Sequence, residues 1–278
     1  VTVGALSDAL RSQAHPQTYP LIDGASWIGL DRLAADASLA VDGVGAIDYF
    51  SRLFSQLLHR HAAQFVGIHE AQLLFGWLQR EMPAAAKELS QAISLPRFAE
   101  VLRMLVSERV SLRNVKQIVE ALVCWAPREK ETAALAEHVR LALRAQLCQE
   151  FANGGVLYVL LLERDLEERL RASLQQTVRG WVLAVEHETV QVLLAQARRL
   201  AGAAGHRATA PVMLTAQDLR RPLRQLVLDD WFDLHALSYA ELTPTQRVHS
   251  LGTIAITDHS SKNASSMSMG STGQAPSV

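Results

Sequence analysis

The segment from Leu95 to Glu131 places two amphipathic helices next to each other and so limits the folds open to this chain. Large apolar residues recur there at intervals of three and four, the spacing that lines one face of an α-helix. The first series is Phe98, Val101, Leu102 and Leu105, and the second is Leu112, Val115, Val119 and Leu122. Ser111, just before the second series, is a residue type that caps helix N-termini. The segment predicts a helical core in which no side chain is placed for chemistry.

Length and charge restrict the class of protein. At 278 residues the chain can hold one large domain or two ordinary ones. The formal net charge of −1 argues against a field that recruits nucleic acid or an acidic membrane surface. The two cysteines, Cys124 and Cys148, show no CxxC or Cys/His pattern, which indicates small apolar residues in a reducing compartment. No apolar run approaches the ~18 residues that span a bilayer, and the chain does not open on a signal peptide, so we expect a soluble piece of a longer protein.

The hydrophobic period changes near residue 151. Residues 49–150 read as helices throughout and predict a helical subdomain, with one long helix from about 128 to 151. Residues 151–256 alternate between strand-like and helical segments, which predicts a small α/β subdomain with a mixed sheet. The fold class is therefore α+β in several parts. Residues 1–48 have a weak pattern, and the Ser-rich tail at 257–278 is predicted to be disordered.

The α/β part is expected to contain five strands. They are predicted at 156–162, 181–185, 211–214, 234–237 and 252–256. Helices are expected between them at 165–177 and 188–201, and a third begins after Thr215, where residues 215–218 match the capping box S/T-x-x-D/E.

No pattern in the sequence indicates catalysis, a cofactor or a metal. His59, His61 and His69 are the densest histidine group, but two of them lie two apart on a helix and face different directions. The glycines at 43–45 and 24–29 lack the remaining residues of dinucleotide and phosphate loops. No G-x-S-x-G is present, and neither cysteine has a neighbour that would activate it.

Three arginines on one predicted helix are the strongest charge cluster. Arg220 and Arg224 share a face, where they repel each other unless an acidic group or a ligand neutralises them. A solvated face is favoured over a docking patch, because Asp229 and Asp230 follow closely enough to serve as partners.

Five segments of the chain form a distinctive set, and they are HAAQFVGIHE at 61–70, LVSERVSLRN at 105–114, IVEALVCWAPREKE at 118–131, LAEHVR at 135–140 and LSYAEL at 237–242. In order and spacing they resemble one family, the export-gate (FHIPEP) proteins of flagellar and virulence type III secretion systems. The family forms of these segments are H-A-x-x-F-I-G-I-Q-E, L-V-x-E-x-V-S-I-R-N, I-L-E-A-L-x-x-W-A-x-x-E-K-D, L-T-E-Y-V-R and L-S-Y-Q-E-L. The resemblance extends over about residues 27–256, and two of the versions lean toward the virulence systems.

The resemblance implies a fold and a role in protein transport. Members have an N-terminal membrane domain in the inner membrane and a four-part cytoplasmic domain, which forms a nonameric ring beneath the export channel. The implied partners are other copies of the chain, other export-apparatus proteins, and secretion chaperones with their substrates. Residues 49–150 would be the third cytoplasmic part, 151–256 the fourth, and 1–48 a remnant of the first. The chain would then be an N-terminally truncated, non-enzymatic ring component at the cytoplasmic face of the membrane.

Charged residues inside the matching helical segments are candidates for ring contacts. They are Glu108, Arg113, Arg140 and Arg144. Intramolecular salt bridges are an equally good interpretation of them. Two other functions stay open: a small soluble α/β enzyme with its site at the strand ends of the second domain, or a helical adaptor with an unrelated partner.

Overall fold

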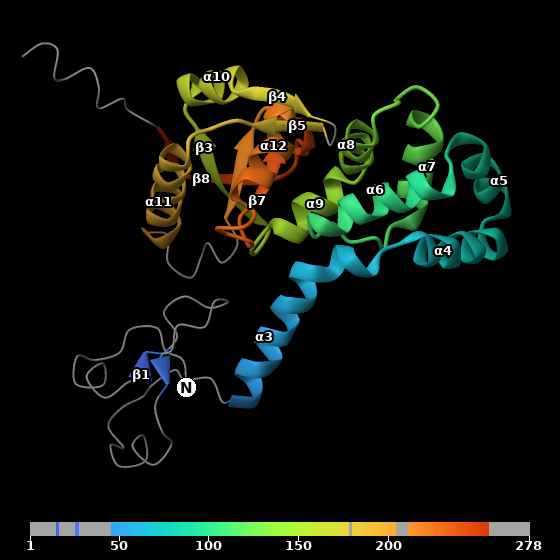
Figure 1. Cartoon of the computed structure of the whole chain (residues 1–278), viewed down its shortest axis with the longest axis horizontal. Helices are drawn as coiled ribbons and strands as arrows, with labels where there is room; N and C mark the ends of the chain where they lie inside the picture. Colours follow the sequence, from blue (N-terminus) through green and yellow to red (C-terminus); the bar gives the residue numbers. More distant parts are fainter. Residues whose placement is uncertain (1–14, 17–25, 28–45, 178–179, 204–210, 256–278) are drawn as a thin grey trace, which may run out of the picture. The chain divides into compact units, whose positions relative to one another are not determined.

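The computed structural model describes residues 15–16, 26–27, 46–177, 180–203 and 211–255 (Figure 1). The chain divides into two compact units, Val1–Leu112 and Arg113–Val278. The predictions made for the loop glycines at 24–29 and 43–45 and for the tail at 257–278 fall largely or wholly outside the described residues. The division into subdomains at residues 49, 151 and 257 stays a prediction.

The described part of the first unit consists mainly of helices. They are α3 (Ala46–His61), the 3-10 helix η1 (Ala62–Phe65), α4 (Ile68–Glu81), α5 (Pro83–Ala92) and α6 (Leu95–Ser107). Two short strands, β1 (His15–Pro16) and β2 (Ser26–Trp27), pair antiparallel. At the start of α4, the Glu70 carboxylate accepts a hydrogen bond from the Gly67 N–H at 2.8 Å. Bonds from the N–H groups of Glu70 itself and Gly67 hold the pKa of this carboxyl below its ordinary value.

The apolar series that predicted α6 forms part of the core of the first unit. Phe98, Val101, Leu102 and Leu105 are all buried, as the three-and-four spacing requires. The backbone around η1 is tied to this helix, because Arg103 Nε donates a hydrogen bond to the Val66 carbonyl at 2.9 Å. The first predicted helix of the central segment is therefore confirmed.

The second unit begins with three helices, α7 (Val115–Trp125), α8 (Thr132–Ala142) and α9 (Arg144–Phe151). Helix α7 confirms the second predicted helix, but its N-cap is Asn114, whose side chain accepts a bond from the Gln117 N–H, and not Ser111. The single long helix predicted over 128–151 was wrong, since Leu143 separates α8 from α9. Leu143 and Leu147 are both fully buried, so the break leaves the apolar residues on both sides of it packed.

A parallel four-stranded sheet forms the centre of the rest of the unit. Its order is β7-β6-β3-β8, with β3 (Val156–Leu162), β6 (Val212–Thr215), β7 (His235–Ser238) and β8 (Arg247–Ile254). The predicted helical part followed by a small α/β part is confirmed, but all pairs in this sheet are parallel where a mixed sheet was expected. The antiparallel pairing lies in a separate hairpin, β4 (Leu174–Thr177) with β5 (Gly180–Leu183). The continuous apolar run of β3 follows from its position between two parallel neighbours.

Three helices pack against the sheet through a shared apolar cluster. They are α10 (Arg164–Ala172), α11 (His187–Ala203) and α12 (Gln217–Val227). Leu160 and Leu162 of β3, Met213 of β6 and Ile254 of β8 contribute the sheet side of this cluster. Helix α10 ends at Ala172, earlier than the predicted end at residue 177, because residues 174–177 form β4. Within the part of the chain that the structure describes, no helix is long and apolar enough to cross a membrane.

We expect Gly252→Ala to destabilise the second unit. Gly252 has a φ of 147°, and a Cβ there would lie 2.7 Å from Leu200 Cδ2. Strain at such a φ costs about 1–3 kcal/mol in the free energy of unfolding, to which the contact with Leu200 adds. Urea unfolding followed by circular dichroism measures this loss.

The matched control is Gly202→Ala in α11, where a Cβ meets nothing within 4 Å. Because alanine is the better helix former, this control should leave stability unchanged or raise it by up to about 1 kcal/mol. Equal shifts of the two unfolding midpoints would contradict the assignment of strain to Gly252.

Candidate functional site

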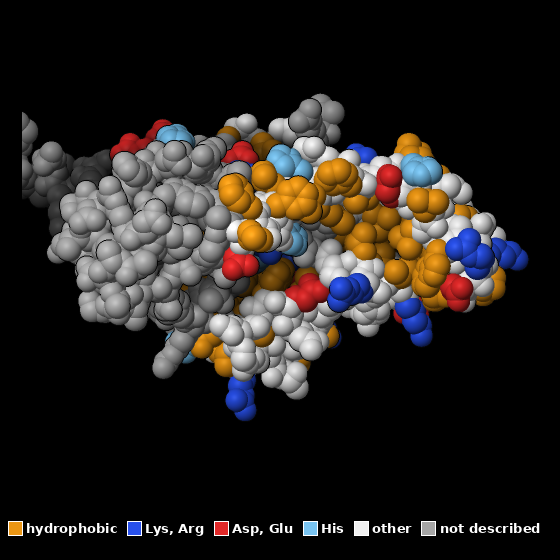
Figure 2. Space-filling view, turned by 90° about the horizontal axis from the view of Figure 1, so that it is seen from below, with side chains coloured by type: hydrophobic (Ala, Val, Ile, Leu, Met, Phe, Trp, Pro, Cys, Tyr) orange, Lys and Arg blue, Asp and Glu red, His pale blue; other side chains and the backbone are white. Residues whose placement is uncertain are grey.

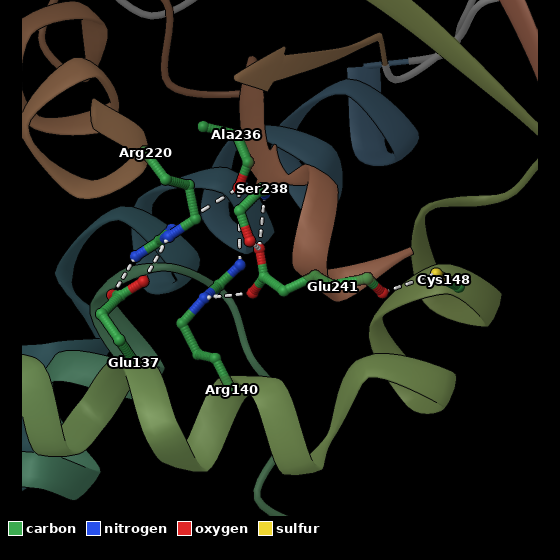
Figure 3. A network of polar contacts seen from close by, with 7 residues as sticks. All are labelled: Glu137, Arg140, Cys148, Arg220, Ala236, Ser238 and Glu241. Carbon is green, nitrogen blue, oxygen red and sulfur yellow. Dashed lines mark hydrogen bonds and ion pairs between the residues drawn. The ribbon is translucent and has the colours of Figure 1, made fainter. Parts of the chain in front are cut away.

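A buried group of polar residues connects α8 and α9 to β7, α12 and the 3-10 helix η3 (Tyr239–Glu241), and Figure 3 shows it from close by. We call it the junction network. Its members are Glu137, Arg140, Cys148, Arg220, Ala236, Ser238 and Glu241. All of them belong to the second unit.

The first ion pair of the network joins α8 to α12. The Arg220 guanidinium donates two hydrogen bonds to the Glu137 carboxylate, one of them from Nε to Oε2 at 2.7 Å. The Arg220 side chain is fully buried, and that of Glu137 is 15% exposed. A planar guanidinium that binds both carboxylate oxygens fixes distance and orientation together. The pair therefore sets how α12 lies against α8.

The second ion pair is more deeply buried and joins α8 to η3. Arg140 Nε donates to Glu241 Oε1 at 2.9 Å, and the two side chains are 2% and 3% exposed. The other oxygen of Glu241 accepts bonds from the N–H and the hydroxyl of Ser238, at 2.7 and 3.0 Å. The Cys148 thiol of α9 donates to the Glu241 backbone carbonyl at 3.3 Å.

The two arginines converge on one backbone atom. Arg140 and Arg220 both donate to the carbonyl of Ala236 in β7, at 3.4 and 3.5 Å (Figure 3). Buried charges are tolerated only when they are paired and hydrogen-bonded. Here each guanidinium meets that condition, because it is paired with a carboxylate and also donates to the shared carbonyl. The geometry thus holds α8, α12, β7 and η3 against one another.

The four residues predicted to make ring contacts fall into two groups. Arg113 and Arg144 are exposed, so their role in ring contacts stays a prediction. Glu108 is buried, with 9% of its surface exposed. Arg140 is buried and forms an intramolecular salt bridge with Glu241, which was the alternative to a ring contact. Helical spacing gave no sign of this pair because its members lie 101 positions apart.

The arginines of α12 also differ from the prediction of a solvated face. Arg220 and Arg224 are buried, 0% and 2% exposed. The acidic partner of Arg220 is Glu137 of α8 rather than Asp229 or Asp230. Arg224 donates to the backbone carbonyl of Phe232 at 2.8 Å.

The three candidate histidines do not converge. His59 Nδ1 lies 2.7 Å from the carbonyl of Ser55 one turn earlier, and His61 Nδ1 lies 3.2 Å from Gln64 Nε2. These two and His69 are exposed. Among the described residues, no group of three or more His, Cys, Asp or Glu side chains is arranged to hold a metal ion.

A second ion pair of α12 lies near the surface. Arg171 of α10 binds both carboxylate oxygens of Asp218, at 2.6 and 3.3 Å. The hydrogen bond from Arg171 lowers the pKa of Asp218 below its ordinary value. The predicted capping box at residues 215–218 was wrong, because the N-cap is Ala216 and the Thr215 hydroxyl donates instead to Glu167.

The first unit carries an exposed apolar stripe on α3. Its residues recur at helical spacing along one face, and they are Ile47 (83% exposed), Phe50 (60%), Phe54 (64%) and Leu58 (44%). Figure 2 shows hydrophobic side chains gathered over this helix. Contiguous exposed apolar side chains on this scale mark sites of protein association more often than chance. We call this group the α3 stripe.

Comparison with known proteins identifies relatives along most of the chain. The FHIPEP family profile matches residues 10–247. The low calcium response locus protein D of Yersinia pestis is 34% identical over 203 residues, which are 73% of this chain and 29% of that protein. The chain thus spans less than a third of the length of such relatives.

Solved structures resemble the fold closely. The CdsV protein of Chlamydia pneumoniae has a TM-score of 0.73 and 28% identity, over 91% of this chain and 74% of that one. The nonameric EscV cytosolic domain from a type III secretion system has a TM-score of 0.64 and 28% identity, over 80% of this chain and 66% of that one.

Arg140→Met should destabilise the second unit strongly. The substitution leaves the buried Glu241 carboxylate without its cation, which costs about 3–5 kcal/mol in the free energy of unfolding. The control is Arg164→Met, which removes an exposed ion pair with Glu168 and should cost less than about 1 kcal/mol. Urea unfolding of both variants measures the difference, and similar small losses would show that the Arg140–Glu241 pair does not stabilise the junction.

Arg171→Gln should raise the pKa of Asp218 toward its ordinary value of 3.8. Because the folded-state pKa is lowered, the pair stabilises the protein above the unfolded pKa, and this stabilisation is lost as the pH falls through the folded value. Carboxyl-carbon NMR titration of the variant and the wild type measures the shift. Arg164→Gln, on the same helix, is the control and should leave the Asp218 titration unchanged; an equal effect would contradict a specific pair.

Proposed function

Because this chain belongs to the FHIPEP family, we propose that it is part of the export gate of a type III protein secretion system. The match over residues 10–247 carries this proposal. The likeness to the nonameric EscV cytosolic domain supports it further, since that protein, with a similar fold, belongs to a type III secretion system and forms a nonamer. The chain would contribute the ring-forming region at the cytoplasmic face of the inner membrane.

The proposed partners follow from that position. Other copies of the chain would complete the ring, and further export-apparatus proteins would contact it. Secretion chaperones with their substrates would dock on the assembled ring before transport. The relative from Yersinia pestis extends well beyond the matched region, so membrane attachment and substrate transport are proposed for the longer protein rather than for this span.

The structure supports a scaffold that binds other proteins rather than an enzyme. The two ion pairs of the junction network join elements of the fold to one another and lie largely away from solvent. An enzyme of the α/β part would need converging reactive groups at the strand ends. The shifted pKa of Asp218 there has a structural cause, its pair with Arg171. We therefore propose a non-enzymatic role.

The α3 stripe is the surface that we propose for contact with a neighbouring protein in the assembly. Four large apolar side chains, each between 44% and 83% exposed, would lose their contact with water there. The exposed Arg113 and Arg144 are proposed as charged contacts that add specificity to the ring rather than much affinity.

We expect the chain to self-associate with rising concentration, and the double substitution Phe54→Glu, Leu58→Glu to weaken that association at least tenfold. Two charges in place of apolar side chains would have to be desolvated on contact. Sedimentation velocity measures the oligomer distribution, and electron microscopy of the largest species tests for a ring.

Gln56→Glu is the matched control, because Gln56 is an exposed residue of the same helix outside the stripe. It adds charge to α3 and should leave association unchanged. If the wild-type chain stays monomeric even as part of the longer protein, the ring proposal is overturned. Loss of association in Arg144→Glu but not in the stripe variant would place the contact at the charged residues instead.

A further inference from the structure

A cavity of about 550 Å³ lies in the second unit, between α8, the β4–β5 hairpin and the start of α12. Its volume falls within the range of sites that hold a small molecule or one to two side chains of a partner. The wall is partly apolar, made by Ala133, Ala134, Leu174, Trp181 and Pro222. Trp181 is 45% exposed, so its indole is accessible to a ligand.

The acidic groups that line the cavity differ in what they bind. Glu137 is paired with Arg220 and Asp218 with Arg171, so these two charges are already neutralised. The Glu131 carboxylate makes no hydrogen bond or ion pair with any residue that the structure describes. Among the described residues, Glu131 is thus the acidic residue of the lining without an ion pair, and the lining also includes the cationic Arg221.

Glu131 and Trp181 line the same cavity, so one ligand can contact both. Gly180, which precedes Trp181 in β5, has a φ of 107°, and a Cβ built on it would be 3.4 Å from Glu131 Oε1. The hairpin backbone therefore approaches the carboxylate where the indole begins. A cation held there would meet a negative charge and an aromatic face together, a combination that favours lysine and arginine.

Two residues of the α8 wall of the cavity are held by contacts within the fold. The Glu137–Arg220 pair of the junction network fixes one turn of α8 that lines it. The next residue, His138, stacks on Trp125 with ring centroids 3.9 Å apart and planes 3° from parallel. A wall that needs no reordering loses less conformational entropy on binding.

We propose that this cavity docks a segment of a partner polypeptide in which a lysine or arginine is next to an apolar side chain. The apolar side chain packs among Leu174, Ala133 and Pro222, and the cation lies between Glu131 and the indole of Trp181. The inference rests on the cavity alone and does not depend on ring assembly. It assigns the α/β side of the second unit a binding surface separate from the α3 stripe.

NMR titration of the ¹⁵N-labelled chain of 278 residues tests this proposal. The probes are two peptides, acetyl-Ala-Leu-Lys-Leu-Ala-amide and the same peptide with glutamate in place of lysine. We expect the lysine peptide to shift the indole N–H signal of Trp181 and the amide signal of Gly180, with a dissociation constant on the order of 1 mM. The glutamate peptide should leave both signals in place.

Two variants separate the roles of charge and aromatic surface. Glu131→Gln should weaken binding about threefold to fivefold. The fold should tolerate it, because the Glu131 side chain makes no capping bond to α8. Trp181→Ala should weaken binding more, since it removes both the cation–π contact and much of the apolar wall. Glu88→Gln, an exposed glutamate of α5 in the first unit, is the control and should bind as the wild type does.

Three results would overturn the proposal. Equal shifts with both peptides would mean that the cavity takes apolar side chains without regard to charge. No shift with either peptide up to ~10 mM would mean that the cavity is not a docking site. If Glu131→Gln bound the lysine peptide with unchanged affinity while Trp181→Ala bound it more weakly, the cation would play no part in recognition.

Discussion

The second unit depends on two buried ion pairs that converge on a single carbonyl. Arg140 and Arg220 approach the backbone of Ala236 from α8 and α12, and each brings its own carboxylate. Removing Arg140 or Glu241 would leave the other charge buried without its ion-pair partner, and removing Glu137 would do the same to Arg220. The contacts of the junction network hold α8 and α9 against the sheet. They also hold the part of α8 that lines the cavity.

The junction network also explains two of the segments that resemble the export-gate family. LAEHVR at 135–140 supplies Glu137 and Arg140, and LSYAEL at 237–242 supplies Ser238 and Glu241. Neither segment contains an evident reactive group. The two segments contact each other through the hydrogen bond from Arg140 to Glu241. HAAQFVGIHE has a similar local explanation, because its Gly67 and Glu70 form the cap of α4. The residues of these three motifs make contacts that hold the fold together.

Much of the fold could be read from local spacing, since a helical face or an apolar strand is recognisable over a few turns. The stripe of α6, the helix α7 and the strand β3 appear where the sequence indicated them, although Leu112 of the second predicted series lies outside α7. Features decided by one or two residues were missed: the cap at Asn114 in place of Ser111, and the break at Leu143. Local patterns offer several capping residues within a few positions, and only packing selects one.

The sequence by itself determined that the chain is a helical part followed by a small α/β part, and its motifs pointed to one family. Only the tertiary structure decided what the charged residues do. Arg140 and Arg220 looked like surface residues, yet each is buried against an acid that lies 101 or 83 positions away. Only the tertiary structure likewise decided that all four strands of the sheet pair in parallel and that a cavity lies between α8 and the hairpin. Period and spacing describe neighbours along the chain, whereas pairing, burial and cavities depend on residues that only folding brings together.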